Sequence, residues 1–221
     1  MPVRPSREPR PRKPNGYIGP LPYSERSDIA HVFKKSPSHE ARIFVVRQEK
    51  RRRIIFRTEW DQRLVISTYV MQKLFNALYP ENSLRPLSIE FQTVDGKKVL
   101  GMTSEIVHGR SNDYKRFSES FYGEGHSPHD SHIKFASSAG KVAGKMVHES
   151  GIVPASNPIN TMNSNGRPIF VEIAYVQDRE KLVEALKSKG VDVNRLREEA
   201  IHHAPSELQN EVRRTWYNVL Q

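Results

Sequence analysis

Clusters of arginine and lysine are the first residues in this sequence whose type and spacing indicate a chemistry. The segment Lys50–Arg53 places four cations in a row between two apolar runs, and the first 24 residues hold seven of the fifteen prolines. Proline favours an extended chain, so these 24 residues are predicted to form an arm. Grouped cations bind phosphate backbones by releasing counterions. The residues predicted to contact nucleic acid or an acidic protein surface are Arg4, Arg7, Arg10, Arg12, Lys13, Lys50, Arg51, Arg52 and Arg53.

The same cations have a second interpretation, in which the arm is a solvated tail and Lys50–Arg53 a charged hairpin tip. No aromatic residue precedes Tyr17, so stacking on single-stranded nucleic acid has little support. Near the other end of the chain, Arg213–Tyr217 combines two arginines with two aromatic residues. This group could face RNA or an acidic partner, or it could belong to an amphipathic helix that covers a core.

Three histidines form a second pattern with chemical potential. His126, His129 and His132 are spaced by three residues, and Asp130 adds an oxygen donor. Imidazoles bind zinc or copper, but this spacing on a loop does not define one coordination geometry and no fourth ligand is evident. We therefore expect a solvated polar loop and predict no metal site.

Several classes of protein are excluded by what the sequence lacks. It has no cysteine in 221 residues, which excludes disulfide scaffolds, thiol nucleophiles and thiolate metal sites. It has no phosphate-binding P-loop and no G-x-S-x-G elbow, and the sequence after Glu172 lacks the lysine of a Glu-x-Lys nuclease pattern. No apolar run reaches the roughly 20 residues of a membrane helix. With no signal-like start, we expect a cytoplasmic protein, or a nuclear one in a eukaryote, that does not engage membranes.

Two strand pairs and one long helix are predicted for the first half of the chain. Runs rich in β-branched and aromatic residues indicate an antiparallel pair at Ala41–Gln48 and Arg52–Arg57, and another at Leu87–Gln92 and Lys98–Thr103. The helix should span Asp61–Tyr79, since Pro80 stops it. The apolar residues expected on its buried face are Leu64, Met71, Leu74, Phe75 and Leu78.

The second half is predicted to be mainly helical with a short β insert. The expected helices are Asn112–Tyr122, Ser131–Ser150, Asp178–Lys189, Asn194–His203 and Pro205–Leu220. The second should bury Ile133, Ala136, Ala139, Ala143, Met146 and Val147, and should stop at Gly151. An irregular segment, Val153–Met162, and a turn at Asn163–Gly166 then lead to a strand at Pro168–Tyr175.

The order of these elements resembles the small kinase fold of RIO-type kinases, the kinase subunit of KEOPS complexes and aminoglycoside phosphotransferases. The first helix ends in LYPENSLRP, the second strand pair ends in VLGMTSEIVHG, and His148–Val153, Asn160, Gly166 and Phe170–Ile173 follow in the family's order. The resemblance covers roughly residues 25–220. It implies an α+β, two-lobed protein: a basic arm (1–24), a sheet-plus-helix lobe (25–105) and a mainly helical lobe (106–221).

The resemblance also implies where a nucleotide site would lie. Family members use a lysine for the nucleotide phosphates, and an asparagine and a carboxylate for the metal ions. In this sequence Arg53 or Arg57 falls at the lysine position, Asn160 at the metal asparagine and Glu172 at the metal carboxylate. If there is no nucleotide site, Asn160 would cap a loop and Glu172 would be a strand carboxylate paired with a basic neighbour.

Other parts of the phosphotransfer apparatus have no counterpart. The position of the catalytic aspartate falls near Ala155 or Ser156, neither of which is a general base at neutral pH. The segment Lys34–Glu40, where a glycine-rich loop should cover the phosphates, has no glycine, and the long helix has no glutamate to pair with the cation. Losing these groups together leaves little preorganisation for catalysis.

The sequence therefore favours a degenerate, pseudokinase-like module that binds nucleic acid or an acidic protein partner, alone or as a subunit of a larger assembly. It predicts no catalytic residues and no cofactor. One alternative is an active atypical kinase that holds Mg–ATP with Arg53 or Arg57, Asn160 and Glu172. Another is a basic α+β nucleic-acid-binding protein unrelated to kinases.

Overall fold

The computed structural model describes residues 42–49, 52–58, 61–94, 97–106, 130–155, 161–164 and 166–221. Several sequence-based predictions fall outside these ranges and stay predictions. They concern the basic arm, Lys50, Arg51, the helix at Asn112–Tyr122, His126, His129 and Asn160.

The first half of the described chain forms one antiparallel sheet with a helix on it. The strands are β1 (Arg42–Glu49), β2 (Arg52–Thr58), β3 (Arg85–Val94) and β4 (Lys97–Ile106), in the order β1-β2-β4-β3. Both predicted strand pairs are confirmed; β1 is shifted by one residue, and the other three strands are longer than expected. At the centre, Gly101 leaves room for the Phe56 ring, since a Cβ at Gly101 would lie 2.3 Å from it.

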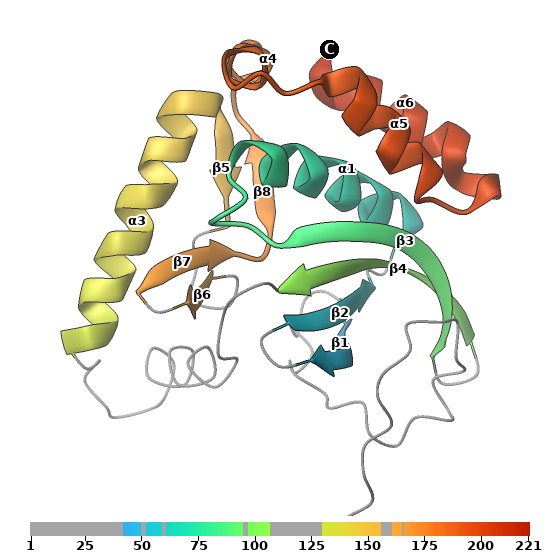
Figure 1. Cartoon of the computed structure of the whole chain (residues 1–221), viewed down its shortest axis with the longest axis horizontal. Helices are drawn as coiled ribbons and strands as arrows, with labels where there is room; N and C mark the ends of the chain where they lie inside the picture. Colours follow the sequence, from blue (N-terminus) through green and yellow to red (C-terminus); the bar gives the residue numbers. More distant parts are fainter. Residues whose placement is uncertain are drawn as a thin grey trace, which may run out of the picture.

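Helix α1 (Gln62–Leu78) connects β2 to β3 and lies across the sheet (Figure 1). Its start is fixed by Asp61, whose carboxylate accepts the backbone N–H of Arg63 at 2.8 Å. The expected burial of Leu74, Phe75 and Leu78 is confirmed, but Leu64 is 39% exposed and that expectation was wrong. The helix is buried on more than one face, because it packs against β3 and β4 on one side and against α6 on another.

A long helix and four short strands follow. They are α3 (Asp130–Ser150), β5 (Ile152–Pro154), β6 (Thr161–Ser164), β7 (Arg167–Phe170) and β8 (Ile173–Val176). Strand β5 pairs with β8 and β6 pairs with β7, both antiparallel.

Two predictions for this region need correction. The single strand expected at Pro168–Tyr175 is two strands in different sheets, and the segment expected to be irregular contains β5 and the start of β6. Along α3, Ala139, Ala143 and Met146 are buried as expected, but Ile133 is 51% exposed and Phe135 is buried instead. The helix stops at Gly151, whose φ of 67° is a left-handed conformation that favours glycine.

Three helices complete the chain and cover α1 from the side opposite β3 (Figure 1). They are α4 (Arg179–Ser188), α5 (Val193–His202) and α6 (Gln209–Leu220), with a short 3₁₀ turn at Ser206–Leu208 before α6. The three predicted helices are confirmed, but the last begins at Gln209 and not at Pro205, which precedes the 3₁₀ turn. Trp216 of α6 is 1% exposed and belongs to the core, as an amphipathic helix requires.

The chain is therefore an α+β protein with antiparallel sheets. A single core cluster contains buried residues of α1, β3, β4, α3 and α4–α6. The core thus continues across the proposed boundary at residues 105/106, and the division into two lobes stays a prediction.

Candidate functional site

An ion pair joins two of the residues that the sequence assigns to a nucleotide site. Nη2 of Arg57 lies 3.0 Å from Oε1 of Glu172. Arg57 is near the end of β2, opposite Ile43 of β1 and Met102 of β4. Its side chain is 8% exposed, whereas that of Glu172 is 30% exposed. The pair thus has a desolvated cation on the sheet and a half-buried carboxylate from the second half of the chain.

Glu172 reaches this position because the chain changes sheets beside it. Val171 and Glu172 connect β7 to β8, and the backbone oxygen of Glu172 accepts the N–H of Ala155 at 2.9 Å. Val171 is buried, and this holds the connection against the core. Glu172 is therefore a connecting residue and not, as the sequence suggested, a strand carboxylate, but it does have the basic neighbour that this interpretation anticipated.

The segment that follows α1 fixes β7 relative to the sheet. Asn82 donates its side-chain amide to the backbone oxygen of Pro168 at 2.8 Å, and its own backbone oxygen accepts the N–H of Phe170 at 2.8 Å. Ser83 forms a parallel bridge with Phe170, and Glu81 pairs with Arg167. This segment belongs to the LYPENSLRP sequence, so its polar residues act as structural links between α1 and β7.

The structure brings together only part of the predicted nucleotide site. Arg53 lies four residues before Arg57 in β2, about 13 Å along the strand. Its backbone is opposite Gln48 of β1 and Ile106 of β4. Of the four residues assigned by the resemblance, Arg57 and Glu172 meet, Arg53 lies further along the same strand, and Asn160 is outside the described residues.

The basic segment Lys50–Arg53 coincides with the end of a hairpin. Strand β1 ends at Glu49, β2 begins at Arg52, and these two residues are opposite each other in the register. Only residues 50 and 51 separate the strands in the sequence. Of the four cations, Arg52 and Arg53 therefore lie at the start of β2, and Lys50 and Arg51 are outside the described residues.

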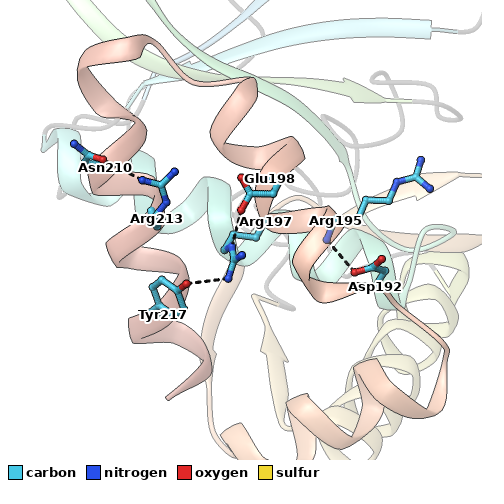
Figure 2. A network of polar contacts seen from close by, with 7 residues as sticks. All are labelled: Asp192, Arg195, Arg197, Glu198, Asn210, Arg213 and Tyr217. Atoms are coloured by element: carbon cyan, nitrogen blue, oxygen red, sulfur yellow. Dashed lines mark hydrogen bonds and ion pairs between the residues drawn. The ribbon is translucent and has the colours of Figure 1, made fainter.

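The arginines of the C-terminal helices are engaged in local contacts (Figure 2). Arg197 of α5 donates to the Tyr217 hydroxyl of α6 at 2.9 Å and pairs with Glu198 at 3.0 Å. Arg213 donates to Asn210 within α6 at 3.2 Å. These contacts favour the second interpretation of Arg213–Tyr217, in which the residues belong to an amphipathic helix.

Sequence reasoning missed two hollows on either side of α1. One, of about 600 Å³, is lined by Arg63, Arg179 and Arg214, with Glu211 beside them. The other, of about 400 Å³, is lined by Lys73, Arg85, Glu199 and His203 together with uncharged residues. No local sequence pattern marks either one, because the first is built from α1, β8, α4 and α6 and the second from α1, β3 and α5.

No family model, no curated protein and no solved structure matches this chain. Among the described residues, no group of three or more His, Asp or Glu is arranged to hold a metal ion. Across the same part of the chain, no helix is both long and apolar enough to span a membrane.

Proposed function

We propose that this chain is a kinase-like binding module without phosphotransfer activity, and that its basic N-terminal residues bind the phosphate backbone of nucleic acid. The observation that carries the first half of this proposal is the ion pair between Arg57 and Glu172. The distribution of charge along the sequence carries the second half.

The kinase-like part is supported by the order of the elements around this ion pair. In the kinase fold, the strand with the phosphate-binding cation precedes the helix that aligns it, and the metal carboxylate comes late in the chain. Here Arg57 is on β2, immediately before α1, and Glu172 follows β7. Two residues that the resemblance assigns to one site are in direct contact, although they are far apart in the sequence.

The loss of phosphotransfer is supported by the same contact. A guanidinium that binds nucleotide phosphates and a carboxylate that binds magnesium must both present their charge to the ligand. Arg57 and Glu172 instead face each other at 3.0 Å, so each neutralises the other. The helix after Arg57 also has no glutamate between Gln62 and Leu78 to take over the pairing. These residues do not fit a magnesium nucleotide.

Nucleic-acid binding is supported by where the positive charge lies. Residues 1–60 contain 15 Lys and Arg against 6 Asp and Glu, a net charge of +9 out of the total of +10. Residues 178–221 contain 8 cations and 8 anions, a net charge of zero. Because counterion release scales with the number of cations at the phosphates, the N-terminal region is the part suited to a polyanion.

The salt dependence of binding tests this proposal. We would measure binding of the full chain to duplex DNA and duplex RNA between low and moderate salt, and then remove residues 1–16. The slope of log affinity against log salt should become less steep by about 4, since four net positive charges are lost and each phosphate contact contributes about 0.9 on DNA. The triple variant Lys50→Ala, Arg51→Ala, Arg52→Ala should lower the slope by about 3 for the same reason.

A matched control removes the same charge elsewhere. Lys134→Ala, Lys141→Ala, Lys187→Ala takes three exposed lysines from α3 and α4. It should leave the slope within about 0.5 of the original value. An unchanged slope in the N-terminal variants would overturn the proposal, as would equal losses in the control. Binding to an acidic protein but not to either duplex would assign the basic residues to a protein partner instead.

A further inference from the structure

The cavity of about 400 Å³ beside α1 contains a lysine that is nine-tenths buried. Lys73 is 9% exposed and lines this cavity together with Asn76 and Ala77 of the same helix. No carboxylate of the described residues lies within 4.0 Å of its ammonium group. Its Nζ lies 5.7 Å from the centroid of the Tyr69 ring. Burying an unpaired ammonium is costly, so this lysine is unusual for a residue of its type.

Three elements build the walls of the cavity. Besides α1, they are the first residues of β3, from Arg85 to Ser88, and the residues Leu196, Glu199 and His203 at α5. The walls are held together by two hydrogen bonds between these elements. The N–H of Ile89 donates to the oxygen of His203 at 3.1 Å, and the Tyr69 hydroxyl donates to the oxygen of Ala200 at 3.4 Å.

Burial in this cavity shifts the lysine toward the uncharged amine. Burial lowers the pKa of Lys73, Glu199 partly opposes this shift, and the nearby Arg85 adds a smaller lowering. Burial is also the main cause that lowers the pKa of His203, the other titratable base in this cavity. Glu199 is itself shared with Arg195, whose Nε lies 3.1 Å from the carboxylate. An uncharged lysine is a nucleophile, whereas an ammonium is not.

We propose that Lys73 is the nucleophile of a binding site for a small carbonyl compound that carries an anionic group. The amine nitrogen attacks the carbonyl carbon and a C–N bond forms. The carbonyl oxygen then leaves as water with two protons from the nitrogen, and an imine remains. His203 and Glu199 line the same cavity and can accept and return these protons. No oxidant or further reactant is needed, and the site does not depend on the proposed nucleic-acid binding.

Arg85 is the residue that would bind the anionic group of the ligand. Its Nη1 is 3.5 Å from Oε2 of Glu105, but its side chain is 61% exposed. Glu105 is buried, but the contact is long and the guanidinium is mostly exposed, so the guanidinium can turn to a carboxylate or phosphate in the cavity. The cavity volume lies in the range of small-molecule sites and suits a ligand of a few carbon atoms.

Reductive trapping tests the proposal on the full wild-type chain. The protein is incubated with glyoxylate and cyanoborohydride at pH 7.5, and the modification of each lysine is followed by peptide mass spectrometry. Lys73 should be modified faster than the exposed Lys141 and Lys145, because a lowered pKa leaves a larger share of its side chain as neutral amine.

A second comparison tests whether the ligand must carry an anionic group. Replacing glyoxylate by the neutral glycolaldehyde should remove most of the preference for Lys73. Arg85→Gln should slow glyoxylate trapping at Lys73, and Arg179→Gln, at an exposed arginine outside this cavity, should not. Modification of Lys73 no faster than that of Lys141 would overturn the proposal. Equal rates for the two aldehydes, or for Arg85→Gln and the wild type, would overturn its anionic part.

Discussion

Replacing Glu172 by glutamine should destabilise the protein because it removes the counter-charge of a buried arginine. Breaking a fully buried ion pair by removing one partner costs about 3–5 kcal/mol, and an exposed pair contributes about 0.2–1 kcal/mol. Arg57 is 8% exposed and Glu172 is 30% exposed, so the structure places this pair between the two limits. We expect Glu172→Gln to lower the free energy of unfolding by about 2–3 kcal/mol. The melting temperature should fall by about 5–10 °C.

Urea unfolding followed by far-ultraviolet circular dichroism measures this change, with Glu81→Gln as the matched control. Glu81 pairs with Arg167, but the side chains are 70% and 50% exposed. That variant should therefore cost less than about 1 kcal/mol. Arg57→Met and the double variant complete a cycle, in which the coupling energy should be about 1–2 kcal/mol. If Glu172→Gln costs no more than Glu81→Gln, the ion pair has no special burial and the reasoning fails.

Three further predictions concern stability. Gly151→Ala should lower the free energy of unfolding, measured in urea, by at least about 2 kcal/mol, because a Cβ at this positive φ would lie 2.3 Å from the Asp178 backbone oxygen. A loss below about 0.5 kcal/mol would contradict the close packing. Asp61→Ala should lose about 1 kcal/mol of helix-capping stability, and Asp61→Asn, which keeps the acceptor for the Arg63 N–H, should lose less; equal losses would refute the cap. Between pH 8 and 10, the free energy of unfolding of the wild type should rise relative to that of Lys73→Met. The reason is that the lowered pKa makes Lys73 lose its proton at a lower pH in the folded chain than in the unfolded chain. Parallel pH curves would show that burial does not shift the pKa of Lys73.

The local elements were predictable because neighbouring residues determine them. The β1–β2 hairpin follows from two β-rich runs separated by a short charged link. The start of α1 follows from Asp61, whose short side chain can cap the helix, and the end of α3 follows from Gly151. In each case the signal lies within a few residues of the element.

Tertiary contacts explain what the sequence could not provide. Residues 168–175 form an uninterrupted run of strand-like composition, yet the chain changes sheets at Val171 and Glu172. Composition does not indicate with which strand each part of this run pairs. Leu64 and Ile133 fit a helical period but are 39% and 51% exposed, because the period alone does not show which helix face meets another element. The reverse holds for Lys73, a polar residue that became buried because α5 packs over its helix.

The candidate site shows the same limit. The resemblance assigned Arg57 and Glu172 to one site, but composition and spacing could not show that they would bind each other. That contact depends on how Asn82 and Ser83 hold β7 against the end of α1. The kinase-like interpretation therefore rests on an arrangement that only the folded chain reveals.

The central claim is that this arrangement does not hold a magnesium nucleotide, and thermal unfolding of the full chain with and without Mg–ATP tests it most directly. A ligand that binds only the folded state at 100 times its dissociation constant adds about 2.7 kcal/mol, or a rise of about 5–10 °C for a chain of this size. We predict a change of less than about 1 °C at millimolar Mg–ATP. A rise of several degrees that disappears in Arg57→Met would contradict the account and favour the active atypical kinase.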